Sequence, residues 1–136
     1  MLLERTAKRL PVLKYGGAFS IKKNSKDIAT SLNFAAQLLD DPENLVLIFP
    51  QGKLYSNFIT KVDFEKGIMK VLEQAADKFQ LVYSTMFIEY FTNKKPQANI
   101  YLKHVTNINF ANIQQLQTSY QQHYDEARQR QTEIIL

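Results

Sequence analysis

The sequence contains no cysteine. This absence excludes disulfide scaffolds, thiolate zinc sites and cysteine nucleophiles, and it fits a protein of the reducing cytoplasm. Glycine and proline are scarce, with four residues of each in 136, and the chain has no linker rich in Gly, Ser or Pro and no internal repeat. The length and the lack of linkers predict one domain, spanning residues 1–136.

Long hydrophobic runs are also absent. The longest is LVLIF at residues 45–49, far shorter than the ~20 residues that cross a bilayer. The first ten residues, MLLERTAKRL, lack the apolar core of a signal peptide. The sequence therefore predicts that any membrane contact is peripheral.

The composition is that of an ordinary globular protein, with 45% hydrophobic and 22% charged residues, which excludes disordered and collagen-like chains. Seventeen basic residues against thirteen acidic ones give a net charge of +4. This excess favours anionic partners. At this point phosphate, acidic lipid and nucleic acid all stay open.

Helices and strands alternate in the predicted order of elements. We expect a helix end at residues 1–9, a short strand at 18–21, and a helix that Asn24 caps and that ends at 40–42, with an apolar stripe at Ile28, Ala29, Leu32, Ala35, Ala36 and Leu39. The run at 45–49 is apolar on both faces, which predicts an interior strand of a parallel sheet. Asp63 is expected to cap the next helix.

The second half of the chain continues the alternation. Strands are predicted at residues 81–90 and 99–103, with a polar connection at 92–96, and Asn112 opens a last helix that reaches toward Ile134. The predicted fold class is α/β, with a mixed, largely parallel sheet flanked by helices.

The first place to look for a ligand is the loop after the apolar run, because ligands of α/β sheets bind beyond the carboxyl ends of strands. Pro50 ends the strand, Gln51 offers amide donors, Gly52 allows close approach of backbone amides to an anion, and Lys53 adds a positive charge. By itself this pattern is typical of a plain strand-ending turn. A phosphate-facing turn is the alternative.

The order of several short segments resembles the PlsC-like family of glycerolphosphate and lysophospholipid acyltransferases. The family's Phe-Pro-Glu-Gly motif is similar to Phe49-Pro50-Gln51-Gly52, and its aromatic, basic second motif to the segment containing Gly17, Phe19, Lys22 and Lys23. Its Phe-basic-Gly element resembles Phe64-Glu65-Lys66-Gly67, and a final apolar strand resembles residues 81–88. The resemblance covers residues 1 to about 105.

The resemblance implies transfer of a fatty acyl group from acyl-coenzyme A or acyl-carrier protein to a hydroxyl of a glycerol-phosphate, lysophospholipid or related acceptor. These carriers act as co-substrates, and no cofactor or metal is expected. It further implies a bacterial enzyme of phospholipid biosynthesis, cytoplasmic and peripheral at the inner face of the membrane. Acceptor phosphate would bind at Phe49, Pro50, Gln51, Gly52, Lys53, Lys22 and Lys23, supported by Gly17, Phe19, Lys66 and Gly67.

The catalytic residues of the family are not found in the sequence. Its His-x-x-x-x-Asp motif has no counterpart, because neither His104 nor His123 has an aspartate five positions later. We expect His104 to be a surface residue at a strand end and His123 to lie on a helix face. The simplest expectation is a chain that is truncated at its N-terminus, corresponds to the C-terminal portion of the domain and is inactive alone. Apolar surface near residues 1–21 would then support self-association.

Several substitutions within the motifs leave alternatives open. Gln51 replaces a glutamate, and Lys22 and Lys23 replace an Asp-Arg pair, so point charges take the place of bidentate phosphate binding. Gly67 falls in the first turn of a helix, which predicts close backbone packing or ligand approach. A non-catalytic module that binds phosphate or lipid is one alternative function. A nucleic-acid-binding domain is another, although the basic residues are scattered and no nucleic-acid partner is expected.

Overall fold

The computed structural model describes residues 2–3, 20–21, 25–53, 55–75 and 79–134. The chain divides into two compact units, which are treated separately. Unit 1 lies within Met1–Lys53 and Phe64–Phe79, and unit 2 lies within Leu54–Asp63 and Gln80–Leu136. The single domain stays a prediction.

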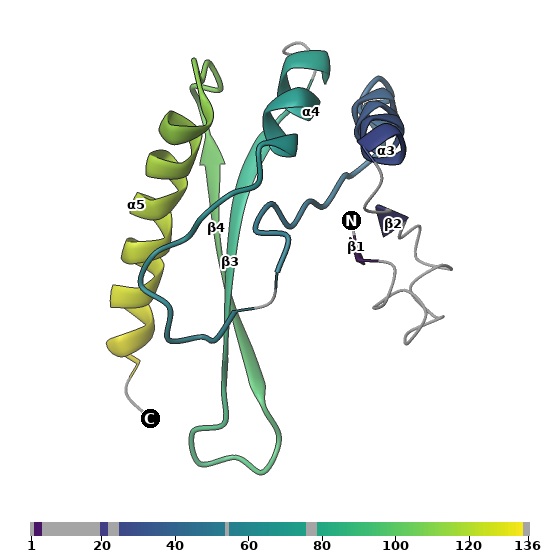
Figure 1. Ribbon diagram of the computed structural model, residues 1–136. Coiled ribbons are helices and arrows are strands. Elements are labelled where there is room, and N and C mark those ends of the chain that lie inside the picture. The colour runs from purple at the N-terminus through teal and green to yellow at the C-terminus, as the bar shows by residue number, and fades with distance from the viewer. Residues whose placement is uncertain (1, 4–19, 22–24, 54, 76–78, 135–136) are drawn as a thin grey trace. The chain divides into compact units, whose positions relative to one another are not determined.

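Unit 1 is built on two helices (Figure 1), α3 (Ser25–Leu38) and α4 (Gly67–Ala75). Their apolar stripes meet in a core of Leu32, Ala35, Ala36 and Val71, and Ile28 and Leu39 pack at its edge. The stripe predicted for α3 is therefore confirmed. A minimal parallel pair, β1 (Leu2–Leu3) and β2 (Ser20–Ile21), belongs to the same unit.

The prediction of an interior strand at residues 45–49 is wrong. Val46 and Ile48 pack against the core of unit 1, but Leu45, Leu47 and Phe49 are 93%, 59% and 57% exposed. The segment is extended, so alternate side chains point in opposite directions, and α3 and α4 supply apolar surface for one of these directions. Covering both faces requires a second apolar layer, which the described residues of unit 1 do not supply.

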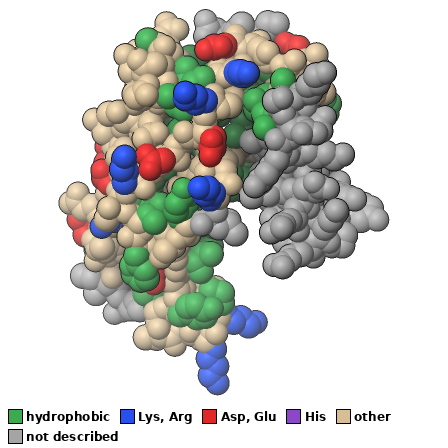
Figure 2. All heavy atoms as spheres, viewed as in Figure 1, with side chains coloured by type: hydrophobic (Ala, Val, Ile, Leu, Met, Phe, Trp, Pro, Cys, Tyr) green, Lys and Arg blue, Asp and Glu red, His purple; other side chains and the backbone are tan. Residues whose placement is uncertain are grey.

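Unit 2 contains an antiparallel hairpin and one long helix. Strand β3 (Leu81–Glu89) pairs with β4 (Gln97–Val105) from Leu81↔Val105 to Glu89↔Gln97, and α5 (Ile113–Thr132) packs along the pair (Figure 1). Tyr83, Thr85 and Phe87 are buried under α5 together with Leu116, Tyr124 and Ala127. Hydrophobic side chains remain visible at the surface over the lower part of the hairpin (Figure 2).

The α/β class is thus confirmed, whereas a largely parallel sheet is wrong for the described residues. Their longest sheet is the antiparallel pair β3–β4. The parallel prediction depended on residues 45–49 as a central strand, and that segment joins no sheet in the described part of the chain. Both strands of unit 2 and their polar connection agree with the sequence.

The two helix caps predicted at Asn112 and Asp63 have different outcomes. Asn112 caps α5 as predicted, with its side chain accepting a hydrogen bond from the N–H of Gln115 at 3.0 Å, and α5 ends at Thr132. Asp63 does not cap α4, which begins four residues later at Gly67. The carboxylate of Asp63 instead accepts a hydrogen bond from Gln117 and lies 3.4 Å from the ammonium group of Lys61.

At the N-terminus, Leu2–Leu3 is a strand and not part of the predicted helix, and Ser20–Ile21 confirms the end of the predicted strand. The cap at Asn24, most of the helix at 1–9, and the apolar surface expected near residues 1–21 lie outside the described residues.

Candidate functional site

The loop that follows the apolar run forms a tight turn in unit 1. The N–H of Gly52 donates to the carbonyl of Phe49 at 3.4 Å, and Gly52 has a φ of +64°. This left-handed conformation is strained for residues that carry a Cβ atom, so the turn requires glycine for its own backbone. A structural turn therefore accounts for part of the motif.

A second motif segment lies against this turn. The N–H of Glu65 donates to the carbonyl of Pro50 at 2.7 Å, and a Cβ atom built on Gly52 would lie 3.0 Å from Cγ of Glu65. Gln51 and Glu65 are 14 residues apart in the sequence. The structure brings Phe49-Pro50-Gln51-Gly52 and Phe64-Glu65-Lys66-Gly67 together. We call these two segments, together with Lys53, the acceptor turn.

The second segment leads directly into α4. The first helical hydrogen bonds run from Ile68 N–H to the Glu65 carbonyl and from Met69 N–H to the Lys66 carbonyl, at 3.4 and 3.2 Å. A Cβ atom on Gly67 would lie 3.3 Å from Cδ1 of Leu32. The close backbone packing predicted for Gly67 is confirmed, and it seats the start of α4 on α3.

The charges of the acceptor turn are mixed. Lys53 and Lys66 are exposed, and the first turn of α4 contains no acidic residue, so the partial positive charge of this helix end is not neutralised from within the helix. Glu65 places a carboxylate beside Gly52, with its Oε1 3.4 Å from the position of the missing Cβ. Gln51 is half-buried. The turn can therefore bind an anion or orient a hydroxyl group.

Glu65 is the site residue that sequence reasoning missed. It lies inside a recognised motif, but no role followed from its spacing. Only the contact with Gly52 reveals that its carboxylate belongs to the turn. The remaining predicted residues, Gly17, Phe19, Lys22 and Lys23, lie outside the described residues, so their relation to the turn stays a prediction.

Both histidines belong to unit 2. His104 is exposed on β4 next to its end, and His123 is on the buried face of α5, as predicted for each. A hydrogen bond of 3.2 Å joins Nε2 of His123 to the carbonyl of Tyr101. Burial lowers the pKa of His123, and the positive charges of Lys103 and Arg130 act in the same direction, against the Tyr101 hydrogen bond and Glu126. His123 is thus a neutral structural residue in contact with the rings of Tyr83 and Tyr120.

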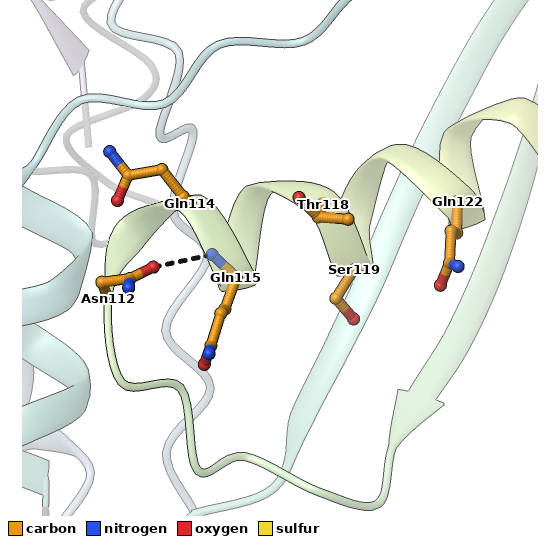
Figure 3. A pocket seen from close by; sticks show the side chains of 6 residues that line it. All are labelled: Asn112, Gln114, Gln115, Thr118, Ser119 and Gln122. Carbon is orange, nitrogen blue, oxygen red and sulfur yellow. Dashed lines mark hydrogen bonds between the residues drawn. The ribbon is translucent and has the colours of Figure 1, made fainter.

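Two surface depressions are lined by residues outside the acceptor turn. The larger, of about 420 Å³, runs along α5 and is lined by Asn112, Gln114, Gln115, Thr118, Ser119 and Gln122 (Figure 3). These side chains offer amides and hydroxyls but no group that titrates near neutral pH. The smaller, of about 240 Å³, lies between α3 and α4 and contains one carboxylate, that of Asp40. Neither arrangement indicates catalysis.

Among the residues that the structure describes, no cluster of His, Asp and Glu could hold a metal ion. No helix within those residues has the length and apolar character to cross a membrane. Comparisons with protein families, with curated proteins and with solved structures found no match for this chain. The acyltransferase resemblance therefore stays a prediction based on the motif residues.

Proposed function

We propose that the chain is an acyltransferase-family domain whose acceptor turn binds the phosphate of a glycerol-phosphate or lysophospholipid. The observation that carries this proposal is the 2.7 Å hydrogen bond from Glu65 N–H to the Pro50 carbonyl. This hydrogen bond connects the two motif segments that resemble the acyltransferase family. Two segments that form one binding site must lie together, whereas two unrelated turns need not.

The physical basis of binding is a small set of donors and positive charges. Lys53 and Lys66 supply ammonium groups, Gln51 supplies an uncharged amide, and α4 contributes the N–H groups of its first turn. The carboxylate of Glu65 would repel a phosphate that lay directly over Gly52. The phosphate therefore binds toward the lysines, and the acceptor hydroxyl lies toward Glu65.

Proton transfer is a separate requirement. Attack on a thioester needs a base for the acceptor hydroxyl, which typically contributes ~100- to 10,000-fold to the rate. In the family that the chain resembles, a histidine supplies this base, and its His-x-x-x-x-Asp motif has no counterpart in the sequence. The full activity proposed for the family domain is acyl transfer from acyl-coenzyme A or acyl-carrier protein. The proposed location is peripheral, on the inner face of the membrane. Lys53, Lys66 and Gln51 support only the acceptor-binding part of this proposal.

Binding of glycerol 3-phosphate, followed by calorimetry, tests the proposal. Replacing both Lys53 and Lys66 with alanine should weaken binding about tenfold or more, because each loses a charged hydrogen bond. The matched control is Lys94→Ala with Lys95→Ala, which removes the same charge from exposed positions outside the turn. Equal affinity of the two double variants would contradict the acceptor turn, as would a wild-type protein that does not bind.

A non-catalytic phosphate-binding module is the second candidate. Two observations favour this candidate. His123 forms a hydrogen bond with the carbonyl of Tyr101, and His104 lies on the sheet face opposite α5. This candidate predicts the same phosphate binding without turnover under any condition. Acyl transfer by the protein would exclude it.

A further inference from the structure

The hairpin of unit 2 carries large apolar side chains on the face that α5 does not cover. Directly opposed residues of an antiparallel pair share a face, and four such pairs, Val82↔His104, Ser84↔Leu102, Met86↔Ile100 and Ile88↔Ala98, lie opposite to the pairs under the helix. The large apolar members of this face are 43–67% exposed. We call it the open face and define it by Val82, Met86, Ile88, Ile100 and Leu102.

An antiparallel sheet with one solvated face normally alternates apolar and polar residues. Here the side covered by α5 carries polar groups as well, including Thr85, Asn99 and Lys103, while the open face is the more uniformly aliphatic one. Apart from Ser84 and His104, the open face thus lacks the polar side chains expected of a face that contacts water. This pattern indicates a face that is covered by something apolar when the protein acts.

The charges around the open face have one sign. Lys94 and Lys95 are exposed in the turn between the strands, beside Tyr90, which is 58% exposed. The acidic residue nearest this turn, Glu89, is opposite Gln97 in a pair on the α5 side, and Lys103 on that side is bound to Glu126. Figure 2 shows basic side chains projecting beyond the hydrophobic ones at this end of the hairpin.

We propose that the open face and the Lys94–Lys95 turn bind the surface of a bilayer that contains anionic lipid. The apolar side chains enter the boundary between headgroups and acyl chains, Tyr90 lies at headgroup level, and the two lysines meet lipid phosphates. A hairpin that lies flat at this depth keeps the N–H and C=O groups of its edges in contact with water.

A second copy of the chain fits this face less well. Two nine-residue strands measure about 30 Å by 10 Å, a footprint of roughly 300 Å². A stable interface between proteins buries about 800 Å² on each partner. Two copies that each carry a net charge of +4 would also repel one another, whereas an anionic bilayer attracts the same charge. Area and charge thus both favour the lipid surface.

The proposal deepens the peripheral position included in the proposed function, but it rests on residues of unit 2 and not on the acceptor turn. Its test is co-sedimentation of the full chain with vesicles of phosphatidylcholine, alone or mixed with an equal part of phosphatidylglycerol. We expect binding to the mixed vesicles that weakens as salt rises. The variant with Lys94→Ala and Lys95→Ala should bind about 30-fold more weakly, at about fivefold for each lysine.

Two further variants separate the contributions. The charge-matched control with Lys61→Ala and Lys70→Ala should bind mixed vesicles within about threefold of wild type, since neither residue lies on the hairpin. The variant with Ile100→Ser and Leu102→Ser should lose binding to both kinds of vesicle. These two residues are 59% and 67% exposed, so unit 2 should fold normally, which circular dichroism checks.

Two outcomes would overturn the proposal. The wild-type protein would not bind vesicles, or the two lysine double variants would lose the same amount of vesicle binding. A dimer in solution that Ile100→Ser and Leu102→Ser convert to a monomer, without vesicle binding, would assign the open face to a second copy. Calorimetry with glycerol 3-phosphate keeps the two proposals apart, because the variants at Lys94 and Lys95 should bind that ligand normally.

Discussion

Gln121 accepts a 2.9 Å hydrogen bond from the backbone N–H of Val62 and donates another, also of 2.9 Å, to the carbonyl of Thr60. Val62 is buried, so its N–H group has little access to water. The hydroxyl of Tyr124 donates to the nearby carbonyl of Ile59 at 2.7 Å. One face of α5 thus holds the segment at 55–63 by matching its backbone groups.

Replacing Gln121 with leucine should lower the free energy of unfolding by about 1–3 kcal/mol, because the Val62 N–H would be left without a partner. Urea denaturation measures this change. Gln122→Leu is the control, since Gln122 is exposed and should change stability by less than about 0.5 kcal/mol. Equal effects of the two substitutions would show that the paired hydrogen bonds do not stabilise unit 2.

Gly52→Ala should destabilise unit 1 by about 1–2 kcal/mol for its left-handed backbone, and by more where the new Cβ meets Glu65. The double variant with Glu65→Ala should recover only the part due to that contact, and Gly52→Asn should cost less than Gly52→Ala because asparagine tolerates this conformation. Unfolding curves of the four proteins measure both parts. A fully neutral Gly52→Ala would mean that the turn has another conformation.

Stability should fall as the pH drops below about 6.5, the ordinary pKa of histidine. Because burial lowers the pKa of His123 in the folded protein, the unfolded chain binds the proton first, and acid favours unfolding. This stability is fully present above pH 6.5 and decreases as the pH falls toward the lowered pKa. His123→Gln should remove this component from the pH profile, whereas His104→Gln, on the exposed side of β4, should retain it.

Acyl transfer from acyl-coenzyme A to glycerol 3-phosphate or lysophospholipid should be undetectable with residues 1–136 alone. The reason is the missing His-x-x-x-x-Asp motif, which supplies the base for the acceptor hydroxyl in the family that the chain resembles. A radiolabelled acyl donor gives the required sensitivity. Turnover that survives joint replacement of His104 and His123 by alanine would show that the base lies elsewhere and that the catalytic assignment is wrong.

The sequence predicted best those features that are decided within a few residues. The stripe on α3 buries Leu32 and Ala35 because helical spacing alone sets which side chains share a face, and Asn112 caps α5 because its partner is three residues away. Asp63 is not a cap because α4 begins only at Gly67, and its carboxylate binds the distant residue Gln117 instead. No local pattern contains that partner.

The same distinction applies to the candidate site. The Phe-Pro-Gln-Gly turn and the tight packing of Gly67 could be predicted because glycine and proline restrict their own backbone. The contact of Glu65 with Gly52 could not, since it depends on how two separate segments meet. The prediction of an interior strand at residues 45–49 was wrong for a related reason. An apolar run indicates which side chains should be buried, but not whether apolar surface covers both of its faces.

The half-exposed LVLIF segment also has a consequence for solubility. Five adjacent aliphatic and aromatic residues with no charge are the kind of stretch that nucleates cross-β aggregates when neighbouring molecules meet. Acidic residues precede the segment, and Pro50 follows it directly. Such flanking residues act as gatekeepers, because like charges repel and proline cannot donate to a growing ladder. Pro50 thus shapes the acceptor turn and also protects the chain from fibril growth.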